Sequence, residues 1–567
     1  MPIKKSELYS SLWKSCDELR GGMDASQYKD YVLVLLFVKY VSDKAKSQKH
    51  YDLDVPKGGS FTDIVALKGT KDIGNEMNKV IKKLAAANDL SGVITVADWN
   101  DKDKLGNDKE MVDRLSKLVG IFQGLDFGGN RAEGDDLLGD AYEYLMRHFA
   151  TESGKSKGQF YTPAEVSRII AKVIGAGSTK NNKQTIHDPT CGSGSLLLKA
   201  HDEAKVATGF DLALYGQEMD NATSALAKMN LILHDCPTGI VEKNNTLAAP
   251  QFTDEKTGKL KTFDFVVANP PFSTKAWSNG VNFNDDPFGR FAFGVPPDKN
   301  GDYAFLLHIL TCLKSTGKGA VILPHGVLFR GNAEADIRKE IVKRGYIKGI
   351  IGLPANLFYG TGIPACIIVL DKERAAERKG IFMIDASKGF IKDGNKNRLR
   401  AQDIHKIVDS FTNQNELPRY SRMVPLAEIS DPKNDFNLNL PRYIDSSEPE
   451  DLQDIDAHLR GGIPNRDLDD LEDYWKVFPG VRSTLFKKAN RAGYSQLRGA
   501  VGDIKASIFE HEEFTAWSEQ TKKLFTKWRK KAAAALRFRD GQTKTPDRIA
   551  IGGVVGLVRE GAAFGPL

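Results

Sequence analysis

The sequence predicts an α/β protein built on a doubly wound, mostly parallel sheet, with helical regions before and after it. Two observations indicate this fold class. The run Phe263–Ala268 is almost wholly apolar and two prolines follow it closely, which is typical of a parallel strand covered on both faces and ended by a stiff turn. Further upstream, short strands near 183–187 and 213–217 are each followed by a stretch of helical periodicity, the alternation that builds a doubly wound sheet.

Length and composition bound the domain organisation. At 567 residues the chain is too long for one hydrophobic core. We predict an N-terminal helical domain over 1–150, a sheet domain over 151–445, and a C-terminal helical region over 446–567 whose tail after Thr543 is poorly ordered. Hydrophobic residues make up 41% and charged residues 27%, which excludes wholesale disorder. The formal charge of +6 permits nucleic-acid binding without requiring it.

The sequence indicates a cytoplasmic protein without a membrane segment or a metal site. Its longest apolar run, 31–41, is interrupted by Lys39 and is far shorter than the roughly 20 residues that span a bilayer. The first residues lack the apolar core of a signal peptide. The five cysteines are scattered without paired spacing, so we expect neither a disulfide framework nor a zinc site.

The candidate catalytic motif is Asn269-Pro270-Pro271-Phe272, directly after the apolar strand. The turn would present the Asn269 amide and the Pro270 carbonyl at the carboxyl edge of the sheet, where open α/β sheets bind ligands. Two acceptors side by side can hold both hydrogens of a planar NH2 group and free its lone pair for attack, while Phe272 stacks on the ring. The motif resembles that of S-adenosylmethionine-dependent amino-methyltransferases, which act on adenine or cytosine in DNA or on a glutamine amide. A plain strand-ending turn is the alternative.

A second motif lies before the sheet, and it consists of Gln159-Phe160-Tyr161-Thr162-Pro163-Ala164-Glu165. Thr162 fits a helix N-cap, Pro163 the first helical position and Glu165 the partner in a capping box. We therefore predict that a helix starts here and that the preceding aromatic residues lie over its start. Simple capping, without a ligand, is the alternative.

A third motif follows the first strand of the sheet, and it consists of Asp188-Pro189-Thr190-Cys191-Gly192-Ser193-Gly194. Gly192 and Gly194 permit a tight strand-to-helix turn that lets a ligand approach the backbone. Leu197 stands where a dinucleotide fingerprint needs a third glycine, and the lysine of a phosphate-binding loop is missing. Glu218 ends the next strand, where nucleoside-binding folds place a carboxylate for the ribose hydroxyls; a surface glutamate is the alternative.

In this order and spacing, the three motifs resemble the modification subunit of type I restriction-modification systems, an adenine DNA methyltransferase. The resemblance includes the helical segments 13–41 and 139–150, and it covers nearly the whole chain. It also includes a closing string, Phe436-Asn437-Leu438-Asn439-Leu440-Pro441-Arg442-Tyr443. Asn245 stands where many relatives carry an aspartate, and its role is left open.

The resemblance implies S-adenosylmethionine as cofactor and no metal. Asn269, Pro270, Pro271 and Phe272 would hold a flipped adenine, and Asp188 would lie at the methionine end of the cofactor. The residues implied to contact the cofactor are Gln159, Phe160, Tyr161, Thr162, Pro163, Ala164, Asp188, Thr190, Cys191, Gly192, Gly194 and Glu218. The implied partners are double-stranded DNA, a separate specificity subunit docked on the terminal helical regions, and a second copy of this chain; a restriction subunit can accompany them.

Two alternative functions stay open. The chain could methylate another planar amine or amide, such as cytosine N4 or a protein glutamine, or it could be a non-catalytic scaffold subunit that senses S-adenosylmethionine. Asn269 and Phe272 argue against the scaffold, because cofactor sensing alone does not need them.

Three regions beyond the motifs carry further expectations. The aperiodic segment 273–302 mixes aromatic and cationic residues, which suits either an extruded base with its phosphates or a small core. Strands near 349–353 and 365–370 are joined by a loop too short for a helical crossover, so they should pair antiparallel and close the sheet near Asp371.

A C-terminal helix should carry an apolar stripe beside basic residues, either for a partner helix or over a local core. The stripe consists of Phe514, Trp517, Leu524, Phe525 and Trp528, and the basic residues are Lys527, Arg529, Lys530 and Lys531.

Overall fold

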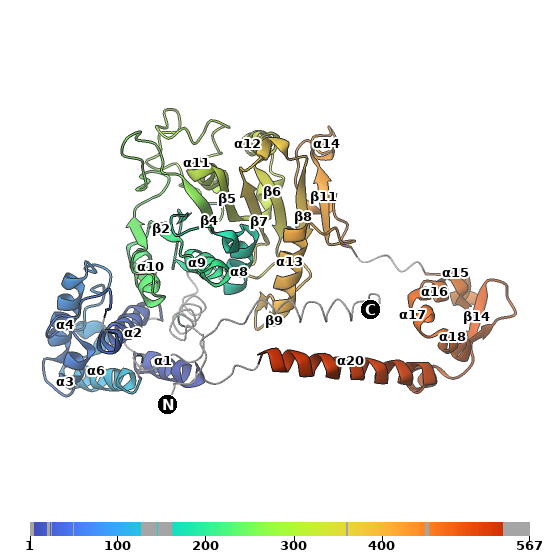
Figure 1. Ribbon diagram of the computed structural model, residues 1–567, viewed down its shortest axis with the longest axis horizontal. Helices are drawn as coiled ribbons and strands as arrows, with labels where there is room; N and C mark the ends of the chain where they lie inside the picture. The colour runs from blue at the N-terminus through green and yellow to red at the C-terminus, as the bar shows by residue number, and fades with distance from the viewer. Residues whose placement is uncertain are drawn as a thin grey trace. The chain divides into compact units, whose positions relative to one another are not determined.

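The chain divides into two compact units, Met1–Ser447 and Glu448–Leu567. The computed structural model describes residues 5–19, 23, 25–48, 50–125, 127, 145, 162–358, 361–447 and 453–536 (Figure 1). The helical segment 139–150, apart from Leu145, and the segment after Thr543 lie outside the described residues.

A nine-stranded sheet forms the centre of the first unit, in the order β3-β2-β1-β4-β5-β7-β6-β8-β11. Its strands are β1 (Thr185–Asp188), β2 (Ala213–Glu218), β3 (Ile240–Lys243), β4 (Phe263–Ala268), β5 (Leu313–Pro324), β6 (Ile347–Gly352), β7 (Ala365–Asp371), β8 (Gly380–Asp385) and β11 (Ser421–Pro425). Strand β7 runs antiparallel to both β5 and β6, as predicted, and β11 runs antiparallel to β8, while the other pairs are parallel.

The prediction that the sheet closes near Asp371 is wrong. After β7 the chain adds β8 in parallel beside β6, and then the edge strand β11. The residues of β8 are an apolar run that is buried almost throughout, so burial against both neighbouring layers places this strand inside the sheet. A small hairpin of β9 (Ile391–Asp393) and β10 (Lys396–Arg398) lies between them in sequence, outside the sheet.

Helices cover both faces of the sheet, which confirms the doubly wound α/β prediction (Figure 1). One apolar core joins the sheet to α8 (Ala164–Val173), α9 (Ser195–Thr208) and α13 (Ala401–Asn413), and the other joins it to α11 (Asp302–Cys312) and α12 (Ala333–Lys343). Successive β4 residues alternate between these cores, since Phe265 packs into the first and Val266 into the second. The short α14 (Leu426–Ile429) follows β11.

The N-terminal helices pack on the sheet part through α10 (Asn221–Leu233). These helices are α1 (Lys5–Leu19), α2 (Ala25–Ser47), α3 (Phe61–Ala66), α4 (Ile73–Ala87), α5 (Lys102–Leu105) and α6 (Asp108–Gln123). Their hydrophobic core includes Leu226, Met229, Ile232 and Leu233 of α10. Because one core contains residues of both parts, the N-terminal helices are anchored to the sheet part by apolar burial.

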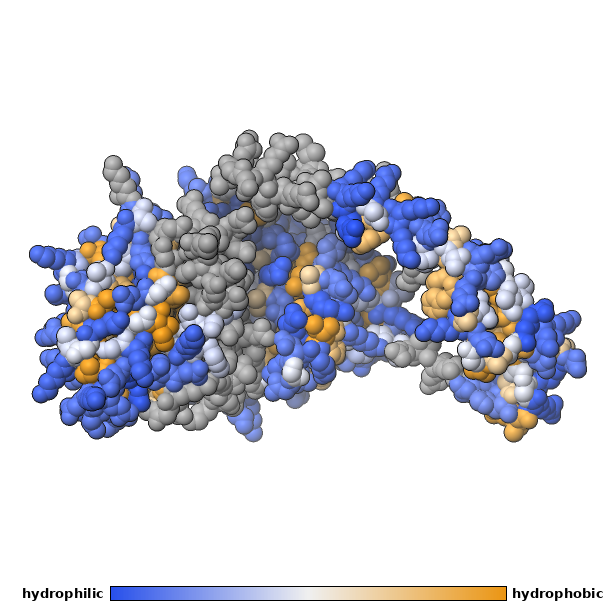
Figure 2. All heavy atoms as spheres, turned by 90° about the horizontal axis from the view of Figure 1, so that it is seen from below, coloured by the Kyte–Doolittle hydropathy of each residue, from blue (hydrophilic) through white to orange (hydrophobic). Residues whose placement is uncertain are grey.

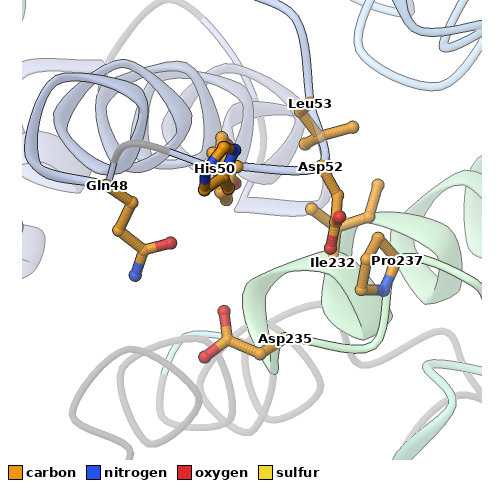
Figure 3. A pocket seen from close by; sticks show the side chains of 8 residues that line it. Gln48, His50, Asp52, Leu53, Ile232, Asp235 and Pro237 are labelled. Carbon is orange, nitrogen blue, oxygen red and sulfur yellow. The ribbon is translucent and has the colours of Figure 1, made fainter.

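A small pocket marks the polar edge of this junction. It has a volume of about 170 Å³ and lies between the segment after α2, which contributes His50 and Asp52, and the end of α10, where Ile232 and Asp235 line it (Figure 3). The Tyr40 hydroxyl donates a hydrogen bond of 3.0 Å to Asp235. The junction is therefore held by polar as well as apolar contacts.

The second unit is mainly helical, and it also contains a small sheet that the sequence analysis did not predict. Its sheet has the order β12-β14-β13. The elements are α15 (Ile455–Arg460), β12 (Ile463–Pro464), α16 (Asn465–Asp469), α17 (Glu472–Val477), α18 (Pro479–Leu485), β13 (Phe486–Lys488), β14 (Tyr494–Leu497), α19 (Ile504–Phe509) and α20 (Glu512–Leu536). The start of α20 packs on the rest of this unit, where Phe514 and Trp517 contact the ring of Phe478.

Hydrophilic side chains cover most of the described surface on the face shown in Figure 2, and apolar side chains gather there in separate patches. Among the described residues, every helix is too short or too polar to cross a bilayer.

Candidate active site

The predicted site residues gather at the carboxyl ends of three neighbouring strands. Strand β1 lies between β2 and β4, with Asp188 paired to Gly216 and His187 paired to Val266. Because the three strands are parallel, the chain leaves all of them at the same edge of the sheet. This edge therefore brings together the Asp188–Gly194 loop, Glu218 and Asn269.

The loop after β1 is held in shape by the end of β2. The Cys191 N–H donates to the Gln217 carbonyl at 2.9 Å, and the Gly192 N–H donates to Oε2 of Glu218 at 3.0 Å. Gly192 and Gly194 have φ angles of +55° and +79°, in the region that favours glycine, so the predicted tight turn is present. Glu218 thus fixes the loop with one carboxylate oxygen.

Beneath this loop, Gly216 of β2 leaves room that a side chain would fill. A Cβ atom at this position would lie 2.9 Å from Sγ of Cys191, closer than such atoms pack. The absence of a side chain at Gly216 therefore allows the loop to lie directly on β2.

Buried polar atoms in the loop have no protein partner. Oδ1 of Asp188 accepts the Thr190 N–H at 2.9 Å, but Oδ2 of Asp188 and the Thr190 hydroxyl form no hydrogen bond, although both atoms are buried. Buried polar atoms normally have a partner, so an unpartnered pair points to a ligand that supplies one. Burial raises the pKa of Asp188 to about 8, with the nearby Glu218 contributing, and burial also raises the pKa of Glu218.

This donor set fits the cofactor implied by the motifs. A carboxylate is the natural partner of the ammonium group at the methionine end of S-adenosylmethionine, and a second carboxylate at the end of the next strand suits two ribose hydroxyls. Asp188 and Glu218 hold these positions, and the glycine turn between them leaves the backbone open to close approach.

Asn269 lies directly after β4, and its amide is held by a residue from the start of α8. Its Nδ2 donates to the Thr162 hydroxyl at 3.1 Å. The oxygen of the amide is therefore left as an acceptor, as the proposed role of the motif requires. Pro270 is buried, whereas Phe272 is partly exposed and meets Phe358 edge-on at 5.9 Å between ring centres.

The predicted capping by Thr162 is wrong, because the helix begins one residue later than predicted and Thr162 lies before its N-cap. The N-cap of α8 is Pro163, and no side chain caps this helix. The helix does start at Ala164, as predicted to within one residue, but the Thr162 hydroxyl accepts a hydrogen bond from Asn269. Of the second motif, Gln159, Phe160 and Tyr161 lie outside the described residues.

Comparison with known proteins identifies the family. The N-6 DNA Methylase family matches residues 133–452, and the HsdM N-terminal domain matches residues 8–122. The chain belongs to the N-6 DNA methylase family. A type I restriction enzyme methylase subunit of Methanocaldococcus jannaschii is 32% identical over 80% of each chain, and one of Mycoplasma pneumoniae is 27% identical over 83% of this chain and 94% of the relative.

A solved methyltransferase subunit of a type I restriction-modification system, from Streptococcus thermophilus, has the same fold. It is 32% identical, with a TM-score of 0.70, and the match covers 78% of this chain and 100% of that one. The sheet described above is thus the S-adenosylmethionine-dependent methyltransferase fold that the motifs predicted, and this N-6 DNA methylase is a DNA methyltransferase of the type I class.

A further contact in the methylase fixes the residue after the Asn-Pro-Pro-Phe motif, and sequence reasoning missed it. Asp302, which is fully buried, accepts the Ser273 N–H at 2.8 Å through Oδ1 and pairs with Arg330 at 2.8 Å through Oδ2. Ser273 has a φ of +51°, so this backbone turn needs support. Asp302 has no sequence signal beyond its place at the start of a helix.

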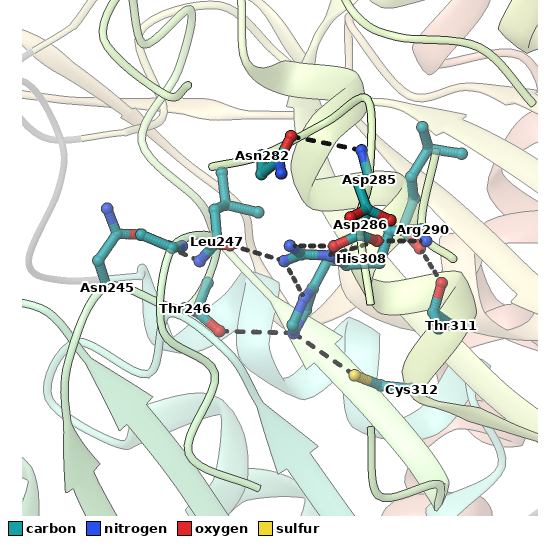
Figure 4. Close-up of polar contacts among 12 residues, drawn as sticks. Asn245, Thr246, Leu247, Asn282, Asp285, Asp286, Arg290, His308, Thr311 and Cys312 are labelled. Atoms are coloured by element: carbon teal, nitrogen blue, oxygen red, sulfur yellow. Dashed lines mark hydrogen bonds and ion pairs between the residues drawn. The ribbon is translucent and has the colours of Figure 1, made fainter. Parts of the chain in front are cut away.

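Part of the segment 273–302 packs inward in the methylase, which agrees with the alternative of a small core. Arg290 and Asp286 form a buried ion pair of 2.8 Å, and Arg290 also donates to the Leu247 carbonyl at 2.8 Å (Figure 4). Trp277 is buried and donates to the Pro297 carbonyl. Since Arg290 is satisfied inside the protein, it is not available to DNA phosphates, whereas Lys275 is exposed.

Two histidines and a cysteine meet beneath this segment. Possible ligand atoms of His187, His308 and Cys312 lie within 4.8 Å of one another, and all three residues are buried. Burial lowers the pKa of His187 to about 4, so it is neutral. However, the Arg290 guanidinium lies 3.4 Å from Nδ1 of His308 (Figure 4), and its charge opposes a metal cation there. We therefore interpret the three side chains as part of the packing.

Proposed function

We propose that this methylase transfers the methyl group of S-adenosylmethionine to the N6 amine of an adenine in double-stranded DNA, after the base is turned out of the duplex. The observation that carries the proposal is the position of Asn269. It lies one strand away from the loop with the unpartnered Asp188 and Thr190 atoms, and its amide oxygen is kept as an acceptor by Thr162. An acceptor for an amine thus lies beside a site suited to the cofactor.

The role of the protein in this reaction is to hold the target base and the cofactor and to orient them toward each other. Oδ1 of Asn269 and the Pro270 carbonyl would accept the two hydrogens of the target amine, which turns its lone pair toward the methyl group. Phe272 would stack on the base, and the contact with Phe358 sets the orientation of its ring. Alignment of the two reactants would supply much of the rate.

The cofactor would be held by Asp188 at its ammonium group and by Glu218 at its ribose, with Thr190, Cys191, Gly192 and Gly194 along its length. Thr162, Pro163, Ala164 and the preceding Gln159, Phe160 and Tyr161 would cover it, as the family resemblance implies. When bound, S-adenosylmethionine supplies an electrophilic methyl group on a positively charged sulfur. No protein nucleophile is needed.

The variant Asn269→Ala tests this proposal, because it separates binding from chemistry. We expect the affinity for S-adenosylmethionine, measured by calorimetry, to be nearly unchanged, while methyl transfer falls by at least about 100-fold. Asn279→Ala is the matched control, since this asparagine is exposed in the neighbouring segment. An equal loss of cofactor binding would contradict the proposed role of Asn269.

The same assay separates the alternatives by their products. Nucleoside analysis of methylated DNA would give N6-methyladenine under this proposal and N4-methylcytosine if cytosine were the target. Methyl incorporation into protein would indicate a glutamine substrate, and tight cofactor binding without any transfer would indicate a scaffold subunit.

We also propose that the methylase works in the cytoplasm as part of an assembly. Its relatives are each named as a subunit of a type I restriction enzyme. In the assembly, a specificity subunit would select the DNA sequence and join two copies of this chain, and a restriction subunit can be added. The exposed Leu524 and Phe525 of α20 are candidate contacts for the specificity subunit.

A further inference from the structure

Helix α20 has a concentrated basic face. Lys522, Lys523, Lys527 and Lys530, hereafter the lysine face, lie within about two and a half turns, with Thr526 among them. The sequence from Gln520 to Leu536 contains no acidic residue. All four lysines are exposed.

Glu519, three residues before Lys522 and four before Lys523, is the nearest acidic residue along α20, and the described residues form no ion pair with the lysine face. Among the described residues, none of the ion pairs or side-chain hydrogen bonds involves these four lysines. Lys523 and Lys527 stand four residues apart and Lys527 and Lys530 three apart, spacings at which like charges on a helix repel each other. An ordinary solvated helix surface mixes both signs of charge, so this face is suited to an external anion.

The opposite side of α20 has a different character. Phe514 and Trp517 at its start pack on Phe478, while Leu524 and Phe525 further along are 43% and 56% exposed. On a helix of 3.6 residues per turn, these apolar residues lie away from the lysine face. An apolar contact on one side therefore leaves the lysines free for another partner.

We propose that the lysine face of α20 binds the phosphate backbone of the DNA duplex that the methylase acts on. This inference rests on the proposed DNA substrate, the polyanion that this chain would meet. Lys522 and Lys530 are separated by about 12 Å along the helix axis. That distance spans between three and four nucleotide steps of about 3.4 Å each, so four flexible lysines can each approach one phosphate. Such contacts carry no sequence preference and add affinity and register.

The salt dependence of DNA binding tests the inference. The methylase would be assembled with its specificity subunit, and the Kd for duplex DNA would be measured from 50 to 300 mM salt for wild type and for a variant with Lys522, Lys523, Lys527 and Lys530 all changed to Gln. Log affinity falls with log salt, and each lost phosphate contact makes this slope less steep by about 0.9. We therefore expect the steepness of the slope to decrease by about 3.6 per chain. Affinity near 0.15 M salt should fall at least about tenfold.

A matched control carries Gln at four other exposed lysines, Lys433, Lys487, Lys488 and Lys505, and should keep the wild-type slope. The lysine-face variant should still methylate DNA at the wild-type maximal rate when DNA is saturating at low salt. An unchanged slope would overturn the inference, and so would failure of the variant to assemble, which would assign the face to an acidic protein surface. A wild-type complex that methylates no DNA would instead refute the proposed function.

Discussion

Asp188 shows at the scale of one residue how a ligand site differs from ordinary packing. Its carboxyl is buried, one oxygen has no partner, and its pKa is raised from 3.8 to about 8 by burial. Between these pH values the folded protein keeps a proton that the unfolded chain has lost. The folded state therefore binds more protons, and this contribution to stability falls as the pH rises from about 4 to about 8.

Asp188→Asn should remove this pH dependence. The melting temperature of the free protein should fall less between pH 5.5 and 8 in the variant than in wild type, because the wild-type slope can reach about 1.4 kcal/mol per pH unit. S-adenosylmethionine affinity should decrease at the same time, since the amide cannot pair with an ammonium group as a carboxylate does. Asp298→Asn, an exposed site, is the control. If the melting temperatures of wild type and variant fell equally between pH 5.5 and 8, Asp188 would not titrate as described.

Among the elements, the strands and turns of the central sheet were the most predictable from sequence. Strand β4 has the predicted bounds, and the third motif forms the predicted strand, glycine turn and helix. These features have local causes: apolar runs, prolines that cannot continue a strand, and glycines with positive φ.

The errors at this scale concern features that depend on distant partners. Thr162 has the chemistry of an N-cap, but it lies before the N-cap of α8, and its hydroxyl accepts a hydrogen bond from Asn269, 107 residues away. The edge strand β11 is short, and it belongs to the sheet only because β8 pairs with it. Asp302 supports the turn at Ser273 by accepting a hydrogen bond from its N–H, although the two residues are 29 positions apart in the sequence. A local pattern cannot contain such information.

The loop after β1 and strand β2 act as one packed layer, which Gly216→Ala should disturb. The new Cβ would lie 2.9 Å from Sγ of Cys191, so the loop must shift. Overpacking of this kind costs about 1–3 kcal/mol, and we expect cofactor affinity to fall about tenfold or more by calorimetry. Adding Cys191→Ala removes the clashing sulfur and should restore part of the affinity. No recovery in the double variant would place the clash elsewhere.

For the whole molecule, burial explains why the N-terminal helices accompany the catalytic sheet. Four residues of α10 belong to the core of the N-terminal helices, so removing those helices would expose an apolar face of the sheet part. The second unit is compact in its own right and carries α20 with its two different faces.

The chain alone should therefore not methylate a defined DNA sequence. Reading bases needs an element that enters a groove with matched side chains, and the second unit is a small sheet with helices whose basic face would suit phosphates alone. Purified chain, labelled S-adenosylmethionine and unmethylated DNA at physiological salt should give efficient, site-specific transfer only when the specificity subunit is added. Efficient methylation of one sequence without it would contradict this expectation.

The hydrogen bond between Thr162 and Asn269 has a consequence for fidelity. Because the amide nitrogen of Asn269 donates to the Thr162 hydroxyl, the amide presents its oxygen, and not a donor, to the target base. A purine with a keto oxygen in place of the amine would then place that oxygen against two lone-pair-bearing oxygens, Oδ1 of Asn269 and the Pro270 carbonyl, with no hydrogen on the C6 substituent to donate to them. Under the proposed function, the pocket would exclude guanine. It would also exclude hypoxanthine, the base that deamination of adenine produces, so a deaminated adenine could no longer be methylated.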